Sequence, residues 1–156
     1  MPVDLKSLRT VIGVATTRRD DAGAALASAR KQLAAAEAQM TQLTDYVDQG
    51  EVKWAGRAAQ GVTPVLMQHQ RHFMDKIRAA IDFQANVIQQ RQAQVARAMQ
   101  ALKTAEQALA KIRKIEHAIL TKIALDSKKI EQKLTDEMAM SMLAHQRRHA
   151  AIEVNP

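Results

Sequence analysis

A seven-residue repeat of apolar side chains begins almost at the first residue and restricts the chain to long helices that pack lengthwise. In a coiled coil, such a repeat marks the a and d positions, and an apolar stripe in water must meet another stripe. The pattern predicts a first helix from about Asp4 to about Asp48, with Asp4 as the N-cap and Arg19 as one charge within the stripe. One series comprises Leu5, Ile12, Leu26, Leu33, Met40 and Val47, and the companion series comprises Leu8, Ala15, Ala22, Ala29, Ala36 and Leu43.

The repeat stops at Gly50, where a stretch rich in glycine begins. Gly50, Gly56 and Gly61 fall within fourteen residues and are followed by Thr63-Pro64. Threonine is a good N-cap, and proline is favoured at the first helical position. We therefore expect a hinge over residues 49–63 and a second helix that begins at Pro64.

A second apolar repeat follows the hinge, and no helix breaker interrupts it before the last residues. It predicts a helix over about 64–149, on the order of 125 Å long, and then a short tail over 150–156. Four polar residues, Gln84, Arg91, Glu116 and Asp126, interrupt the stripe. One series comprises Met67, Met74, Ile81, Ile88, Val95, Leu102, Leu109, Ile123 and Ile130, and the companion series comprises Ile77, Ala98, Ala105, Ile112 and Ile119.

The predicted fold is all-α, a single domain over residues 1–156 that forms a long antiparallel two-helix coiled-coil hairpin whose second helix is the longer. Folding at residues 56–57 would place Met40 near Met74 and Leu5 near Leu109. The second helix would then extend about 35–40 residues beyond the first. An apolar stripe without an intramolecular partner is a surface for docking a partner protein, although fraying or homodimer formation are alternatives.

Composition argues against several classes of function. Cysteine is absent, aromatic residues make up 3% of the chain, and neither a secretory signal nor an 18-residue apolar run is visible. The net charge of +7 is spread along the helices, which is typical of a solvated helix surface. No phosphate-binding loop or catalytic motif occurs, and we interpret His69 and His72 as surface residues. We expect a cytoplasmic protein that is not an enzyme, with no catalytic residue, metal site or cofactor.

Several short motifs flank the hinge and follow along the second predicted helix: Leu43-Thr-Asp-Tyr46, Gly61, Phe73-Met-Asp-Lys-Ile77, Ala80-Ile-Asp-Phe-Gln84, Ile115-Glu116, Glu131-Gln-Lys133 and Asp136-Glu137. With these motifs and the arrangement of helices and hinge, the chain resembles the FliJ family of flagellar type III export proteins and the related YscO-like stalk proteins of injectisomes. The resemblance covers roughly Leu5 to Met140. Two features depart from the family pattern: Gly50 stands where a further aromatic residue is often found, and residues 67–70 lack the aromatics common after the hinge.

The resemblance implies a stalk-like component of the export apparatus that binds a hexameric export ATPase and promotes its assembly and activity. It also implies contacts with an export-gate membrane protein and with export chaperones, so that the chain would lie at the inner membrane only through partners. The residues expected at the ATPase ring are Ile112, Ile115, Ile119, Ile123, Ile130, Lys111, Arg113, Lys114 and Lys122. Those matching the gate-binding surface are Gln39, Leu43, Tyr46, Phe73, Ile77, Ala80 and Gln84.

Other interpretations of the sequence remain open. An injectisome stalk protein would share the same pattern, and a self-associating structural coiled coil would bury the stripe from Ile112 to Ile130 between copies. We expect a monomer or weak self-association. A basic chain also has a generic affinity for nucleic acid or anionic lipid, but aromatic interleaving is missing, so no specific nucleic-acid partner is expected.

Overall fold

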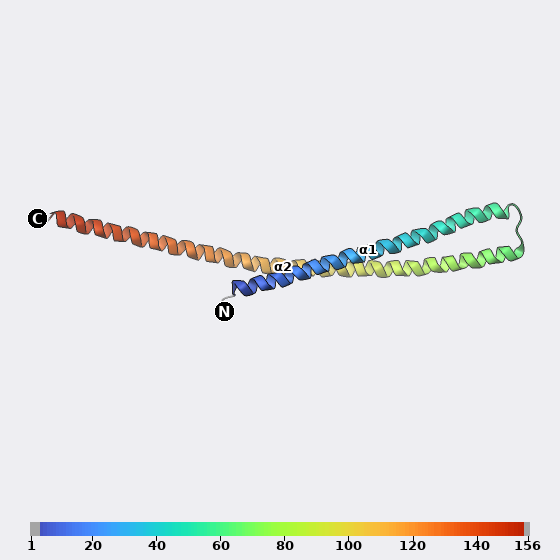
Figure 1. The fold of residues 1–156 in the computed structure, drawn as a ribbon, viewed down its shortest axis with the longest axis horizontal. Coiled ribbons are helices and arrows are strands. Elements are labelled where there is room, and N and C mark those ends of the chain that lie inside the picture. Colours follow the sequence, from blue (N-terminus) through green and yellow to red (C-terminus); the bar gives the residue numbers. More distant parts are fainter. Residues whose placement is uncertain (1–3, 155–156) are drawn as a thin grey trace. The chain divides into compact units, whose positions relative to one another are not determined.

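Two long α-helices make up the computed structural model, which describes residues 4–154. Helix α1 spans Leu5–Ala58 and helix α2 spans Pro64–Val154, and the described residues contain no strand (Figure 1). The fold class is therefore confirmed as an all-α hairpin with a longer second helix. By contacts the described chain divides into two units, residues 13–109 and residues 4–12 with 110–154.

Both helices begin at the caps that the sequence predicts. The backbone N–H of Lys6 donates to Oδ1 of Asp4 at 3.2 Å, and the N–H of Leu66 donates to Oγ1 of Thr63 at 3.4 Å. Each bond satisfies one of the donors that the first turn of a helix leaves without an intrahelical partner. The N-caps Asp4 and Thr63 and the start of α2 at Pro64 are confirmed.

The end of α1 differs from the expected boundary at Asp48. The helix continues through Gly50 and Gly56 to Ala58, so the connection is only residues 59–63. Trp54 becomes half-buried beside the first turns of α2, and Glu51 reaches Arg78 with 3.6 Å between Oε1 and Nη2. These contacts across the hairpin offset the weak helix propensity of two glycines, about 1 kcal/mol each.

The glycine that ends α1 is Gly61. It adopts a φ of +93°, and its N–H donates to the Ala58 carbonyl while the N–H of Gln60 donates to the Arg57 carbonyl. A left-handed residue at this place satisfies carbonyls that the end of a helix would otherwise leave unpaired, and glycine adopts it without a steric penalty.

The far end of α2 also lies beyond the expected boundary. The helix runs to Val154 instead of about His149, because the next helix breaker in the sequence is Pro156. Residues 150–154 of the expected tail are thus helical. Asn155 and Pro156, like Met1–Val3, lie outside the described residues.

The seam of the unit over residues 13–109 is built from the predicted heptad positions. Burying a Leu or Met side chain contributes about 1.5–3 kcal/mol, and alanine at facing positions allows close approach of the two backbones. Every buried residue of this unit belongs to the predicted repeats or interrupts them: Ala15, Leu26, Ala36, Met74, Gln84 and Leu109.

The register of this seam differs from the expected one. The structure brings Met74 to Gly50, where a Cβ atom would lie 4.0 Å from Sδ, whereas the sequence placed Met74 near Met40. The expected partner of Met74 was wrong by ten residues of α1, nearly three helical turns, because the expectation assumed that α1 ends near Asp48. With α1 extended to Ala58, residues near Ala36 face Gln84 instead.

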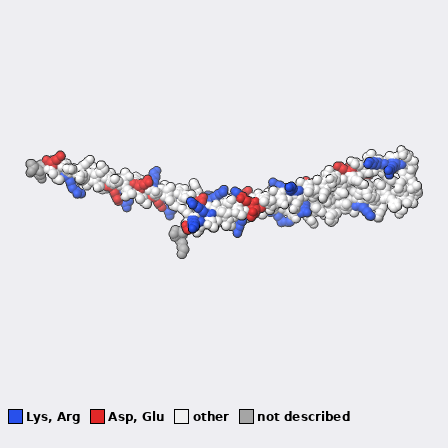
Figure 2. Space-filling model, viewed as in Figure 1, with Lys and Arg blue, Asp and Glu red and all other residues white. Residues whose placement is uncertain are grey.

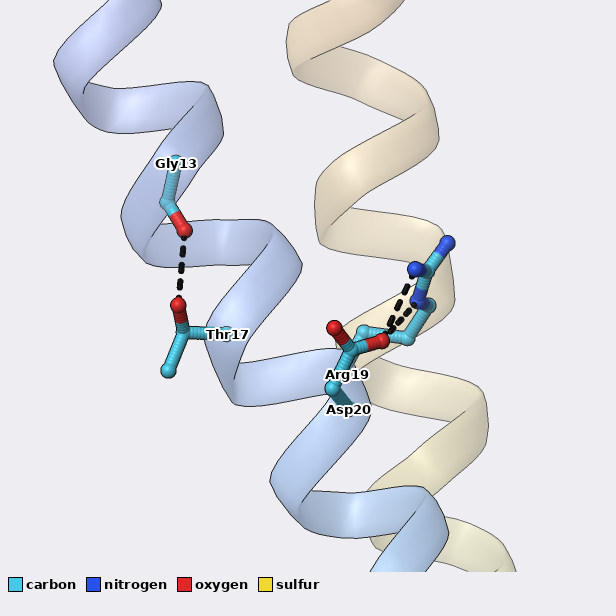
Figure 3. A network of polar contacts seen from close by, with 4 residues as sticks. All are labelled: Gly13, Thr17, Arg19 and Asp20. Atoms are coloured by element: carbon cyan, nitrogen blue, oxygen red, sulfur yellow. Dashed lines mark hydrogen bonds and ion pairs between the residues drawn. The ribbon is translucent and has the colours of Figure 1, made fainter.

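Arg19 is the one charge in the first apolar series of α1, and the structure shows how the seam accommodates it. Its Nε and Nη2 both donate to Oδ1 of Asp20, at 3.0 and 2.8 Å (Figure 3). The side chain stays about one-third exposed, so it is not a charge buried without a partner. One turn earlier, the hydroxyl of Thr17 donates to the Gly13 carbonyl at 3.0 Å.

In the other unit, residues 5–12 of α1 belong with α2 from Ala110 onward. Leu8 is buried, Leu5 and Ile12 are half-buried, and on α2 the half-buried residues are Ile112, Glu116, Ile119 and, much further along, Ala144. Beyond Ile119, every residue through Leu143 is exposed. The uncovered part of α2 therefore begins near Leu120, later than the pairing of Leu5 with Leu109 implied.

Candidate partner-binding surfaces

The exposed length of α2 carries part of the predicted ATPase-ring surface. Ile123 and Ile130 are 48% and 61% exposed, and Ile115 is also exposed. Ile112 and Ile119 are instead half-buried in the unit that contains residues 5–12, so the expectation that both would be uncovered was wrong. The stripe available to a partner is therefore Ile115, Ile123 and the residues that follow.

The basic candidates of this segment are all exposed. Lys111, Arg113, Lys114 and Lys122 extend into solvent, and further lysines lie at positions 128, 129 and 133. On the face shown in Figure 2, the basic and acidic side chains lie in scattered patches of both colours. Charge on this face can orient an approaching partner, but exposed charges contribute little to affinity.

A run without any charge, residues 138–144, was missed at the sequence level. It reads Met-Ala-Met-Ser-Met-Leu-Ala and follows Glu137 directly. At 100° per residue, its apolar side chains cover about two-thirds of the helix circumference, with Ser141 in the remaining gap, and Met140 is 71% exposed. A heptad pattern does not reveal this run because its apolar side chains extend well beyond a single stripe, whereas its lack of charge is visible in the sequence.

At the hinge end, the two aromatic residues expected at the gate-binding surface lie against each other. The ring centroids of Tyr46 and Phe73 are 5.9 Å apart, with the planes inclined at 68° in an edge-to-face arrangement. The side chains are 54% and 44% exposed, so together they present an aromatic surface to solvent. Aromatic side chains of this kind are frequent hot spots in protein interfaces.

The other residues predicted at this surface divide between surface and seam. Gln39 and Ala80 are exposed, whereas Leu43 and Ile77 are half-buried. Gln84 is 8% exposed and donates to the Ala36 carbonyl at 2.9 Å. Gln84 therefore joins the helices, and the structure offers little of it to a partner.

A shallow groove adjoins the aromatic pair. Tyr46, Gly50 and Trp54 of α1 line it together with Phe73 and Met74 of α2, and Lys53, Arg57 and Gln70 complete its wall. The groove combines aromatic and basic groups on one side of the hairpin, which suits an amphipathic segment of a partner protein.

The described residues show no arrangement for metal binding or for crossing a membrane. Within residues 4–154, no group of three or more His, Asp or Glu side chains is placed to hold a metal ion. Neither helix, over its described length, has a window apolar enough to span a bilayer.

Comparison with known protein families shows the family of this chain. A family model described as flagellar FliJ protein matches residues 5–148. The chain belongs to the FliJ family. A FliJ protein is a non-catalytic component of flagellar type III protein export, so the chain is a component of that apparatus. Searches of curated proteins and of solved structures returned no match.

Proposed function

We propose that this FliJ-family protein acts as the stalk of the export apparatus, with the exposed end of α2 inside the ring of the hexameric export ATPase. In this role the chain promotes assembly and activity of the ring and performs no catalysis itself. Its basic side chains face the lining of the ring. The carrying observation is that α2 is exposed from Leu120 to Leu143 while apolar side chains continue along it.

The distribution of these side chains favours a partner that surrounds the helix. A helix that packs on one partner helix needs one apolar stripe, whereas a helix that is apolar on all sides is normally enclosed. Ile123 and Ile130 form a stripe, whereas the apolar side chains of residues 138–144 cover about two-thirds of the helix circumference, with Ser141 in the gap. A closed ring can cover both segments, and a single partner helix leaves part of the second one in water.

The opposite end of the hairpin supports the second part of the proposal, a contact with the export-gate membrane protein. The Tyr46–Phe73 pair and the neighbouring groove around Trp54 provide exposed aromatic surface beside basic groups. Through this contact and the ATPase the protein would work in the cytoplasm, at the inner membrane. Export chaperones are further partners in this proposal.

The stalk role can be tested with a substitution in the exposed stripe. Ile123→Asp should leave helicity and thermal stability unchanged, because the side chain is already half in solvent. It should lower stimulation of the purified export ATPase at least tenfold, since the charge would have to enter an apolar contact. Ser28→Asp is the matched control, because it adds the same charge at an exposed position of α1, outside the segment proposed to enter the ring.

Two results would contradict the stalk role. Full stimulation by the Ile123→Asp variant would show that the exposed stripe does not engage the ATPase. A stable dimer at micromolar concentration in sedimentation, lost in the same variant, would favour the self-associating coiled coil instead.

A further inference from the structure

Two polar layers cross the apolar seam of the unit over residues 13–109. Nε2 of the buried Gln84 donates to the Ala36 carbonyl at 2.9 Å and to Oε1 of Gln39 at 3.2 Å. One heptad further along α2, Nη1 of Arg91 donates to Oε1 of Gln32 at 2.8 Å and to Oε1 of Gln94 at 3.1 Å. The two bonded positions on α1, Gln39 and Gln32, are also one heptad apart.

The apolar part of this seam distinguishes poorly between registers. On α1 the alanines at 22, 29 and 36 alternate with Leu26, Leu33 and Met40. On α2 a large aliphatic residue recurs every seven positions from Ile81 to Leu109. A shift of one helix by one heptad would therefore place alanine and aliphatic side chains against equivalent neighbours.

We propose that the Gln84–Gln39 and Arg91–Gln32 pairs form a two-rung ladder that sets the register of the hairpin, and that neither rung is sufficient alone. Either rung can be remade after a shift of one heptad. In a backward shift, each residue of α2 faces a position of α1 seven residues nearer the N-terminus than in the observed register, so Gln84 meets Ala29 and Gln32, which repeat Ala36 and Gln39. In a forward shift, each residue of α2 faces a position seven residues nearer the C-terminus of α1, so Arg91 meets Gln39.

Only the observed register makes both rungs together. The backward shift leaves Arg91 facing Ala25, and the forward shift leaves Gln84 facing Leu43 and Tyr46. Gln84 is buried, so the forward shift leaves a polar group out of water without a partner. Arg91 is only half-buried, so the backward shift is disfavoured by the lost bond to Gln32 alone. A buried polar residue is a well-attested means of fixing the register of a coiled coil.

The register also decides which side chain stands beside Phe73. The observed register places Tyr46 there, whereas the backward shift would place Gln39 opposite Phe73 and would move the last seven residues of α1, including Gly56, into the turn. Gln84 and Arg91 are therefore positioning residues for the aromatic pair. The consequence for gate binding rests on the proposed function, but the ladder itself does not.

Distance measurement between two spin labels tests the ladder. The chain has no cysteine, so Ser28→Cys and Lys76→Cys, both at exposed positions, provide two unique label sites. With Gln84, Arg91, Gln39 and Gln32 unchanged, the two labels should give one distance. Arg91→Leu should add a second population about 10 Å shorter, and Gln84→Leu one about 10 Å longer, since seven residues span about 10 Å of helix.

Substitution of the acceptors on α1 gives a second, independent pair of variants. Gln39→Ala leaves Gln32 as the one glutamine acceptor of the ladder on α1, which Gln84 reaches in the backward shift, so a population with a shorter label-to-label distance should appear. Gln32→Ala leaves Gln39, which Arg91 reaches in the forward shift, so a population with a longer distance should appear. Arg97→Leu, an exposed arginine outside the ladder, should retain one distance. One unchanged distance in all four ladder variants, or shifts of the same sign in all four, would overturn the proposal. The labels report on the chain alone, so this result does not depend on any partner.

Discussion

Leu26 shows at the scale of one residue how little side chain holds the hairpin together. It is 6% exposed, and the other buried residues of its unit are only Ala15, Ala36, Met74, Gln84 and Leu109. Leu26→Asp should lower the free energy of unfolding by at least about 4 kcal/mol, because a carboxylate would be buried without a partner. Thermal unfolding followed by far-ultraviolet circular dichroism would measure the loss.

Ser28→Asp is the control for this substitution. Ser28 is exposed only two residues away, so its replacement should change the unfolding free energy by no more than about 0.5 kcal/mol. Equal stability of the two variants would mean that Leu26 does not lie in the seam.

The residues of the seam could be predicted from the sequence, but their partners could not. The heptad repeats identified Leu8, Leu26 and Met74 as buried because periodicity depends only on one helix. Gln84 and Arg91 could be recognised only as interruptions, since their acceptors lie more than forty residues away on α1. Which glutamine meets which donor depends on the register, and a pairing between two helices has no local signal in the sequence of either one.

At the scale of the helix, the glycines of α1 and the turn should respond oppositely to alanine. A Cβ atom at Gly56 meets no atom within 4 Å, and Gly56 lies inside α1. Gly56→Ala should therefore stabilise the protein by about 1 kcal/mol. Gly61 also has open space, but its φ is +93°, so Gly61→Ala should destabilise the protein by about 1–2 kcal/mol. Urea denaturation of both variants would check the signs.

The glycines within α1 explain why its C-terminal end was expected at Asp48, ten residues before the observed end at Ala58. Local propensity favours an end at Gly50, where the heptad repeat stops, and the sequence contains no local signal that contradicts it. The helix continues because Trp54 and Glu51 find contacts on α2, which are long-range in sequence. A stabilising effect of alanine at position 61 would show that the turn, too, had been misinterpreted.

At the scale of the whole molecule, the sequence predicted two helices of unequal length, and the structure and the family match support that prediction. The candidate sites were predicted less completely. The aromatic pair was identified from residue type and from the resemblance, and the structure brings Tyr46 and Phe73 into contact. The uncharged run at residues 138–144 was missed, and Ile112 and Ile119 were expected to be more exposed than they are.

Unequal packing along the chain should appear as unequal backbone protection. Helices that lack tertiary packing are marginal in water, so amides of residues 121–153 should open with free energies near zero. Amides in the paired segments around Leu26 and Gln84 should exchange only through openings that cost several kcal/mol. Hydrogen exchange followed by mass spectrometry would resolve the two classes of amides. Slow exchange throughout residues 121–153 of the isolated chain would contradict this prediction.

Addition of the export ATPase should slow exchange over residues 120–144 and leave exchange in the segment around Leu26 unchanged, because the proposed enclosure covers only the exposed end of α2.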